Sequence, residues 1–212
     1  GYDEALSSPL NLSMERGQKI ALIGSNGIGK TTLLKSILGL IKPLSGEVEQ
    51  GDYLHIGYFE QEMSPDINTT CMEEIWNEFP GFSQYEVRSA LAKCGLTTKH
   101  IESKVKVLSG GEQAKVRLCK LINRETNILL LDEPTSAVDA KAEYEIFRNI
   151  LEHQQNRTTV IISHRFSTVR KAKQIMVIDH GKVIERGTHQ ELIKQNGLYK
   201  EMFDLQAEGY VN

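Results

Sequence analysis

Residues 24–31 constrain this chain more than any other stretch, because their sequence GSNGIGKT fits the pattern G-x-x-x-x-G-K-[ST]. An apolar run at 20–23 leads into them, and a helical pattern at 32–38 leads out. In a strand, glycine-rich loop and helix of this kind, the glycines let main-chain N–H groups point at a polyphosphate. The helix N-terminus adds positive potential at the same place. We therefore predict a phosphate-binding loop; the alternative is a glycine-rich turn that binds nothing.

The side chains of this loop predict how a nucleotide and its metal ion would be held. Lys30 can reach the β- and γ-phosphates, and the Thr31 hydroxyl can hold Mg²⁺. The other nucleotide-binding residues that we predict here are Ser25, Asn26, Gly27, Gly29 and Thr32.

A second glycine motif occurs at 108–113, where the sequence is LSGGEQ. A serine and two glycines that open a helical pattern indicate another anion-binding helix N-terminus. One phosphate-binding loop leaves little use for a second in the same pocket. We therefore expect Ser109, Gly110 and Gly111 to serve the nucleotide of a second copy of the chain. The alternative is an ordinary serine N-cap.

Two later apolar runs end in side chains that can do chemistry. Residues 128–131 are followed by Asp132 and Glu133, and a run at 159–162 leads to His164. Such runs indicate buried parallel strands, and ligands of these sheets gather at the carboxyl ends of the strands. We predict that Asp132 holds Mg²⁺, that Glu133 orients the attacking water, and that His164 contacts the γ-phosphate. The alternatives are carboxylates that face solvent and a structural histidine.

Gln61 follows a shorter strand pattern that begins at Gly57. Its side-chain amide could bind Mg²⁺ or the attacking water. Taken alone, it is equally well explained as a surface glutamine.

Together these motifs resemble those of an ABC (ATP-binding cassette) nucleotide-binding domain, and the resemblance covers nearly the whole chain. They occur in the order of that family, which is Walker A at 24–31, Q-loop at Gln61, signature at 108–112, Walker B at 128–133, D-loop at 136–139 and H-loop at His164. The resemblance implies an α/β P-loop NTPase fold of the ABC type, with a mixed or parallel sheet, covering helices and an inserted helical subdomain. It also implies a head-to-tail dimer that sandwiches two ATP molecules between Walker A of one subunit and the signature of the other. In such a dimer, Tyr2 would stack on adenine and Asp139 would link the two sites.

The chain is expected to fold as one ATP-binding core with a helical insertion. We place the first part of the core at 1–61, the helical subdomain at 62–122 and the second part of the core at 123–212. Within the first part, 47–49 has the pattern of a strand. In the helical subdomain, Trp76 and Phe79 recur at helical spacing and are expected in its core.

The two ends of the chain resemble different branches of the family. Up to about Leu131 the chain is similar to ABC-F-type proteins, as shown by YFEQE at 58–62 and LSGGEQAKVRL at 108–118. After Pro134 it is similar to the ATPase end of a membrane exporter. The residues that carry this second resemblance are SAVD at 136–139, ISHRFSTVR at 162–170 and DHGKVIERGTHQEL at 179–192. We infer a mosaic, natural or engineered, with its junction between Arg117 and Ser136.

Composition narrows the setting in which the chain acts. A net charge of −3 gives no basic field that would attract nucleic acid. No segment approaches the roughly 20 apolar residues that span a bilayer, so we expect no membrane insertion. Any transmembrane domains would lie on another chain or have been removed. The three cysteines are widely spaced, which fits the reducing cytoplasm; Cys94 and Cys119 are expected to be small core residues.

Three functions remain open from the sequence. The first is a Mg²⁺-dependent ATPase that works as the motor domain of an ABC transporter, with a second nucleotide-binding domain as its partner. The second is one cassette of a ribosome-associated ABC-F translation factor. The third is a folded recombinant that has no physiological partner.

Overall fold

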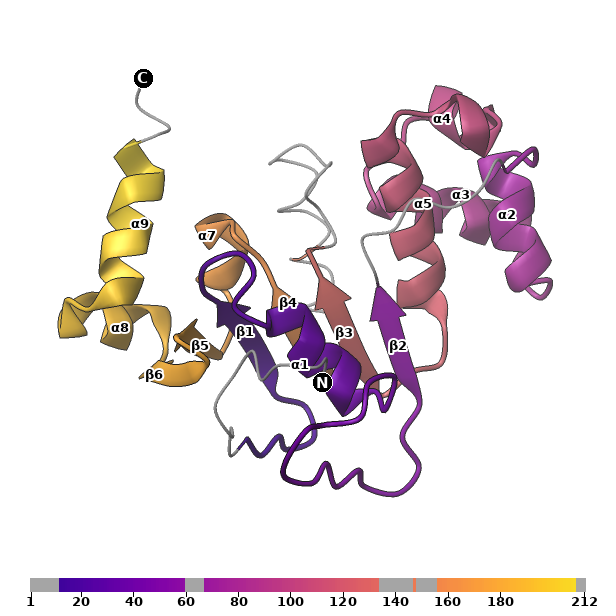
Figure 1. The fold of residues 1–212 in the computed structure, drawn as a ribbon. Helices are drawn as coiled ribbons and strands as arrows, with labels where there is room; N and C mark the ends of the chain where they lie inside the picture. Colours follow the sequence, from indigo (N-terminus) through magenta and orange to yellow (C-terminus); the bar gives the residue numbers. More distant parts are fainter. Residues whose placement is uncertain (1–11, 60–66, 134–146, 148–155, 209–212) are drawn as a thin grey trace. The chain divides into compact units, whose positions relative to one another are not determined.

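The computed structural model describes residues 12–59, 67–133, 147 and 156–208 (Figure 1). The chain divides into two compact units. The first takes in residues 1–56, 126–132 and 156–212, and the second takes in residues 57–125 and 133–155.

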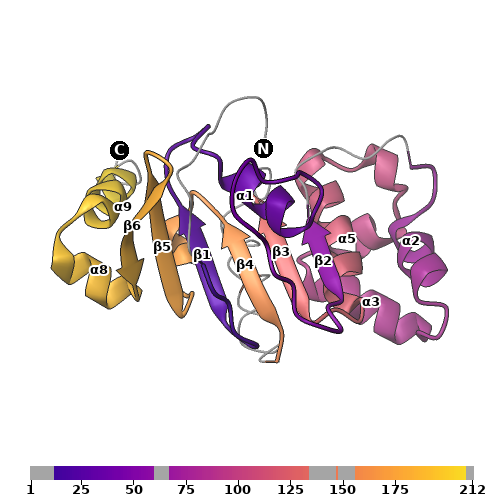
Figure 2. The same ribbon diagram turned by 60° about the horizontal axis from the view of Figure 1, so that its bottom comes forward.

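The first unit is built on a mainly parallel sheet. Its strands are β1 (Lys19–Ile23), β3 (Ile128–Asp132), β4 (Thr158–Ile162), β5 (Gln174–Asp179) and β6 (Lys182–Gly187). With β2 (Ile56–Phe59), the strand order is β2-β3-β4-β1-β5-β6. β3, β4, β1 and β5 run parallel, and β6 pairs antiparallel with β5 (Figure 2). The result is the α/β class with a mixed sheet that the sequence predicts.

Burial explains the sequence pattern of these strands. Every residue of β1 and β4 is buried, which is typical of parallel strands covered on both faces. β6 instead alternates between exposed and half-buried residues, as expected of an antiparallel edge strand with one wet face.

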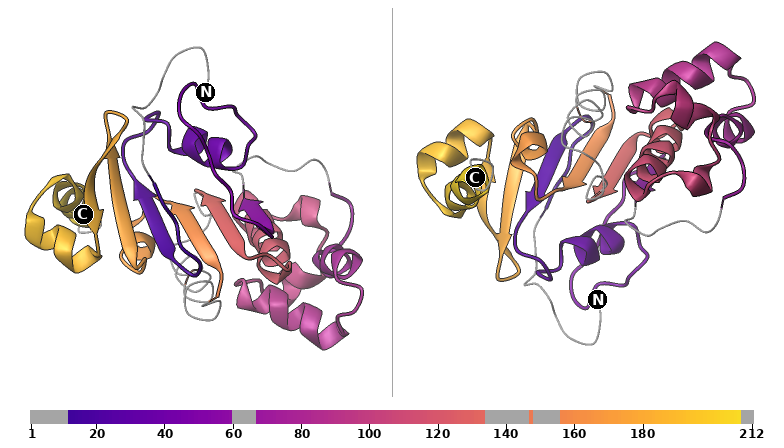
Figure 3. Two further views of the ribbon diagram at one scale, coloured as in Figure 1. Left: turned by 90° about the horizontal axis from the view of Figure 1, so that it is seen from below. Right: turned by 90° about the horizontal axis from the view of Figure 1, so that it is seen from above.

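Helices cover both faces of this sheet and its β6 end. α1 (Lys30–Ile37) lies on one face and α7 (Phe166–Val169) on the other (Figure 3). α8 (His189–Gln195) and α9 (Leu198–Glu208) lie beyond β6.

An aromatic cluster holds α7, α8 and α9 together. The ring of Phe166 meets those of Tyr199 and Phe203 edge-on, with centroids 5.2 and 5.5 Å apart. The buried hydroxyl of Tyr199 lies 2.8 Å from Nδ1 of His189. Burial raises the pKa of Tyr199 to about 12, so this hydroxyl stays protonated at neutral pH.

Beyond β2, the second unit is mainly helical in its described part. Its helices are α2 (Cys71–Glu78), α3 (Gln84–Lys93), α4 (Thr98–Glu102), a 3₁₀ turn (Val105–Val107) and α5 (Gly110–Asn123). Each α-helix among them begins with a capping box, in which a Ser or Thr side chain and the residue three positions later satisfy each other's main-chain N–H groups. The N-cap residues are Thr70, Ser83, Thr97 and Ser109.

Apolar packing and one charged cluster join these helices. Ile75, Val87 and Leu91 are fully buried in a shared core, together with the free thiols of Cys71, Cys94 and Cys119. The prediction that Cys94 and Cys119 are core residues is therefore confirmed. On the outside of this core, Lys120 of α5 bridges Glu74 and Glu78 of α2 at 2.7 and 3.3 Å.

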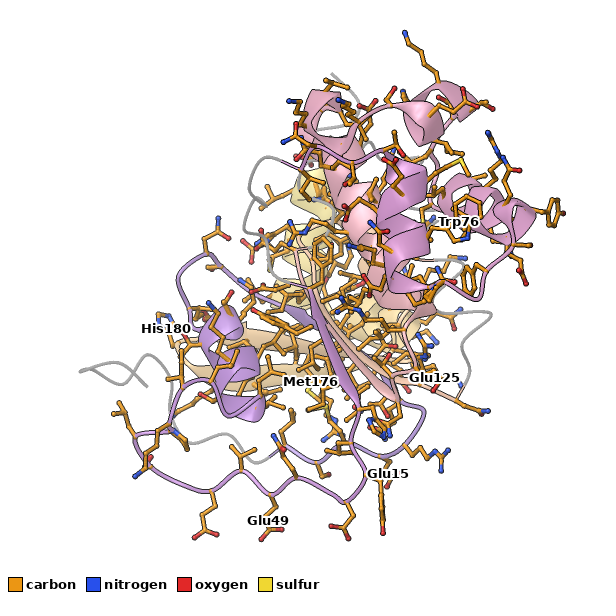
Figure 4. The ribbon with its side chains drawn as sticks, turned by 90° about the vertical axis from the view of Figure 1, so that its right-hand side faces the viewer. Glu15, Glu49, Trp76, Glu125, Met176 and His180 are labelled. Carbon is orange, nitrogen blue, oxygen red and sulfur yellow. The ribbon has the colours of Figure 1, made fainter. Side chains whose placement is uncertain are left out.

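The structure corrects two expectations from the sequence. Residues 47–49 form no strand, and the side-chain amide of the nearby Gln50 donates to the Ile37 carbonyl at 2.6 Å. A strand needs a neighbour to pair with, and a three-residue alternation does not supply one. Trp76 is 38% exposed on the surface of its unit, where its indole N–H donates to the Phe82 carbonyl (Figure 4). Phe79 does pack against the core, stacked on Phe82.

We expect Leu91→Ala to destabilise the second unit far more than Tyr85→Ala on the same helix. Leu91 is 0% exposed, so its truncation leaves a cavity and lowers the free energy of unfolding by roughly 2–5 kcal/mol. Tyr85 is 80% exposed, so its truncation should change the free energy by less than about 0.5 kcal/mol. Urea denaturation followed by the fluorescence of Trp76, the single tryptophan, measures both. Equal losses would contradict this account of the core.

Candidate functional site

The parallel register places three predicted motifs on neighbouring strand ends. Ile162 of β4 is the partner of Leu22 on one side and of Asp132 on the other. The glycine-rich loop begins directly after β1, Asp132 ends β3, and His164 follows β4 by two residues. Carboxyl ends of adjacent parallel strands meet at one edge of a sheet, where ligands of α/β proteins bind.

Glycine is required by the loop at 24–29 for two different reasons. Gly24, Gly27 and Gly29 have φ angles of 153°, 79° and 96°. A Cβ on Gly24 would collide with the main-chain carbonyl oxygen of Ile178 on β5, so that position is also sterically closed. Gly27 has nothing within 4 Å of such a Cβ, so only its conformation calls for glycine.

The start of α1 is arranged to receive an anion. Its N-cap is Gly29, which makes no side-chain capping bond, and its first turn carries no acidic residue. Ser25, Asn26, Gly27 and Thr31 are exposed, so the loop can be approached from solvent. Uncapped N–H groups at a helix N-terminus bind phosphate readily.

Lys30 lies within this loop. Its side chain is only 6% exposed, and Nζ donates to the carbonyl oxygens of Gly24 and Ser25 at 2.8 and 2.7 Å. The ammonium group therefore lies against the main chain of the loop that would wrap a phosphate. A triphosphate there would offer it anionic acceptors in exchange for these neutral ones.

Asp132 and Glu133 are consecutive residues but differ in backbone conformation. Asp132 ends β3 and is 5% exposed. Glu133 has a φ of 43°, which is unusual for a residue other than glycine and turns the chain sharply after the strand. Such a conformation stores roughly 1–3 kcal/mol of strain and is typical of functional positions.

These residues fit a nucleotide with magnesium. A buried carboxylate, a hydroxyl at the first turn of α1 and phosphate oxygens are the hard oxygen ligands that Mg²⁺ prefers. Thr31 and Asp132 would supply the protein's share. Among the described residues, no cluster of three or more His, Cys, Asp or Glu side chains could hold a metal ion.

The signature serine lies at the start of α5 and caps it. Ser109 Oγ accepts from the Glu112 N–H at 3.4 Å, and the Glu112 carboxylate accepts from the Ser109 N–H at 2.8 Å. The structure thus contains the ordinary N-cap that was the alternative for this motif. This cap satisfies only part of the free N–H groups at the helix N-terminus, so an anion could still bind there. The role of Ser109 toward a second nucleotide stays a prediction.

His100 extends this cap. Its Nδ1 accepts from the Thr97 N–H at 3.4 Å, which leaves the proton of the neutral ring on Nε2. Nε2 lies 3.2 Å from Oε1 of Glu112. The Ser109 N–H is the largest cause of the lowered pKa of Glu112; partial burial opposes it, while the Ser109 hydroxyl, His100 and Lys115 lower it further. Nothing in the sequence pattern singled out His100.

Three predicted site residues lie outside the described residues. They are Tyr2, Gln61 and Asp139.

A separate cavity lies within the first unit but does not coincide with the predicted nucleotide site. It measures about 1000 Å³ and is lined by α1, by residues 47–56 and by β3. Its lining includes Leu33 and Ile37 but neither the loop at 24–29 nor Asp132 and His164. The predicted nucleotide-binding residues therefore lie at the strand ends and not in this cavity.

Comparison with known proteins identifies the family. The ABC transporter family pattern matches residues 7–136. The chain belongs to the ABC transporter family. It is 65% identical over 164 residues to the uncharacterized ABC transporter ATP-binding protein YfmM of Bacillus subtilis, a match that covers 77% of this chain and 31% of YfmM. That match is longer than the stretch before the predicted junction, so similarity to YfmM continues past it.

Two further proteins align with a larger share of this chain than YfmM does. The ABC domain is 34% identical over 219 residues to the probable multidrug resistance ABC transporter ATP-binding/permease protein YheI of Bacillus subtilis, covering 93% of this chain and 37% of YheI. A solved structure of a bacterial Atm1-family ABC exporter with ATP bound superposes with a TM-score of 0.79 at 28% identity, over 98% of this chain and 40% of the exporter chain. ABC-F family proteins also match.

The chain is thus an ABC ATP-binding domain homologous to those of exporters, as the motif order indicated. It spans between 31% and 40% of the length of these similar proteins. None of the helices in the described ranges combines the length and the apolar character that crossing a bilayer requires.

We expect Gly24→Ala to weaken nucleotide binding, and Gly81→Ala to leave it unchanged. The added methyl group at Gly24 meets the Ile178 carbonyl, which should lower stability by roughly 1–3 kcal/mol and nucleotide affinity by roughly tenfold or more. Gly81 has open space around it. Titration with a fluorescent ATP analogue and thermal denaturation measure both effects. If both variants bound alike, the close approach at Gly24 would not shape the loop.

We expect Glu112→Gln to flatten the acid side of the stability profile. The pKa of Glu112 lies below its ordinary 4.5 in the folded state, so its contribution to the free energy of unfolding is present above that value and is lost as pH falls through the folded pKa. Glutamine can still accept from the Ser109 N–H but does not titrate. Thermal melts between about pH 7 and about pH 3 should show a smaller fall for Glu112→Gln than for wild type. Glu125→Gln, which neutralises an exposed carboxylate of the same unit, is the control and should melt as wild type does at each pH.

Proposed function

We propose that this ABC domain binds Mg-ATP and hydrolyses it to ADP and phosphate, as one half of a head-to-tail dimer that drives a transporter. The observation that carries the proposal is the register that puts the glycine-rich loop, Asp132 and His164 on adjacent strand ends. That arrangement places hydrogen-bond donors for phosphate, a metal ligand and a polar side chain along one edge of the sheet.

Each residue has a distinct task in this proposal. Lys30 and the main-chain N–H groups of 25–32 hold the β- and γ-phosphates. Thr31 and Asp132, with Gln61, would hold Mg²⁺, which would neutralise the charge that develops on the phosphate oxygens. Glu133 orients the attacking water, and His164 contacts the γ-phosphate. Positioning and charge neutralisation supply most of the rate enhancement in phosphoryl transfer.

The second copy completes each site. Ser109, Gly110 and Gly111 at the N-terminus of α5 would face the γ-phosphate bound by the partner subunit's loop. Asp139 would link the two sites, and Tyr2 would stack on adenine. A single copy then lacks part of the machinery and should turn over slowly.

A transporter motor is favoured over an ABC-F translation factor. The exporter structure aligns with 98% of this chain, whereas two ABC-F relatives align with 84% and 92% of it. Transmembrane domains would come from the remainder of a longer protein or from another chain. The domain would work at the cytoplasmic face of the membrane, where ATP is supplied.

The test is the ATPase rate per molecule as a function of protein concentration, with Mg²⁺ and with a chelator. We expect the rate per molecule to rise with concentration and to vanish without Mg²⁺. Glu133→Gln should bind ATP but turn over roughly 10²- to 10⁴-fold more slowly, because it removes the carboxylate that orients water.

Two results would contradict the proposal separately. Full turnover by Glu133→Gln would remove that residue from its role. A rate per molecule that is high and independent of concentration would rule out a site shared between two copies.

A further inference from the structure

We propose that Gln206 on α9 is a positioning residue that holds the main chain around His164, so that the imidazole can meet the γ-phosphate. This inference rests on the proposed role of His164 in ATP hydrolysis. Gln206 lies 42 residues from His164 in sequence, and no pattern in the chain links the two.

Both ends of the Gln206 amide are used. Its Nε2 donates to the main-chain carbonyl of His164 at 2.7 Å. Its Oε1 accepts from the main-chain N–H of Phe166 at 2.9 Å. The orientation of the amide is dictated by its partners, since a carbonyl only accepts and an N–H only donates. One side chain thus bridges the residues on either side of Arg165.

A local hydrogen bond also restrains the turn after β4. The N–H of Arg165 donates to Oγ of Ser163 at 3.1 Å. Together with the two bonds from Gln206, this contact ties down the main chain on both sides of His164. The imidazole then begins from a fixed Cα, which is what placing a ring against a phosphate requires.

The helix that carries Gln206 is itself anchored at its far end. The carboxylate of Glu185, on β6, accepts from the N–H groups of Leu198 and Tyr199 at 2.5 and 3.1 Å. A side chain on Gly197 would collide with that carboxylate. The Glu185 carboxylate thus lies at the N-terminus of α9, where a negative charge stabilises a helix.

Aromatic packing aligns the rest of α9 with the turn. Tyr199 and Phe203, one turn apart on α9, both meet the ring of Phe166. Gln206 lies three residues after Phe203, on the same face of the helix. The same residue, Phe166, is thus held through its side chain by two rings and through its N–H by Gln206.

Glutamine suits this position better than its near relatives. Glutamate would keep an acceptor for the Phe166 N–H but would set a carboxylate oxygen against the His164 carbonyl, with no donor between them. Methionine has a similar length and removes both hydrogen bonds.

The test compares steady-state ATPase kinetics of wild type, Gln206→Met, Gln206→Glu and Leu205→Met. Leu205 is the neighbouring residue on α9 and is 63% exposed, so Leu205→Met is a matched control that should behave as wild type. We expect Gln206→Met to lower kcat by roughly ten- to a hundredfold. Affinity for ADP, which has no γ-phosphate, should stay within about twofold of wild type. Gln206→Glu should not restore kcat.

A double-variant cycle separates positioning of His164 from general support of the fold. In a His164→Ala background, Gln206→Met should lower kcat no further, because the side chain that it positions is gone. A thermal melt of each variant shows whether it is folded at the assay temperature, and Gln206→Glu takes the place of Gln206→Met in the cycle if the latter is not.

The outcomes distinguish this inference from the proposed function. If wild type hydrolyses no ATP at any concentration, the proposed function fails, and this inference fails with it. If wild type is active but Gln206→Met matches Leu205→Met, only the role of Gln206 is overturned. An equal loss of kcat with and without His164 would also overturn it, because that pattern indicates a structural role.

Discussion

The register between β3, β4 and β1 is the constraint on which the site depends. Ile162 pairs with both Leu22 and Asp132, so the glycine-rich loop, the buried carboxylate and His164 leave the sheet at the same level. A shift of one residue in any of these pairings would turn the buried side chains of that strand to the other face. Because β1 and β4 are buried along their whole length, such a shift gains nothing and disrupts packing on both faces. The apolar runs that form the sheet therefore also set the spacing of the polar groups at its edge.

Two helix N-termini in this chain are treated in opposite ways, and the difference matters for function. α5 begins with a complete capping box, which His100 extends. α1 begins at a glycine that offers no side-chain acceptor, with no acid in its first turn. An uncapped helix N-terminus leaves main-chain donors that a ligand can satisfy, whereas a capped one has already satisfied part of them. This contrast is consistent with a triphosphate bound mainly by the loop before α1, with the start of α5 added only when a second copy approaches.

Local signals were enough to predict the class of fold and the buried strands, because runs such as 128–131 and 159–162 are apolar without alternation and end at polar residues. They were not enough for 47–49, where alternation over three residues has no pairing partner to make a strand. Trp76 was misplaced for a related reason: helical spacing says that residues share a face, but not which face a neighbouring helix covers. The cap at Ser109 was open from the sequence, because the same serine and glycines suit an N-cap and an anion site equally. Gln206 could not be found at all, since its partners lie 40 and 42 residues away and are main-chain atoms without a sequence signature.

α9 is connected to the edge of the sheet through a short series of contacts. Glu185 fixes the start of α9, the rings of Tyr199 and Phe203 seat the helix on Phe166, and Gln206 grips the main chain beside His164. Each contact is modest, since a single hydrogen bond contributes only about 1 kcal/mol to stability. Their value lies in geometry: together with the bond from the Arg165 N–H to Ser163 Oγ, they restrain the turn that carries His164. A histidine at a strand end can meet a phosphate only if its main chain is held in place, and in this fold the last helix supplies that restraint.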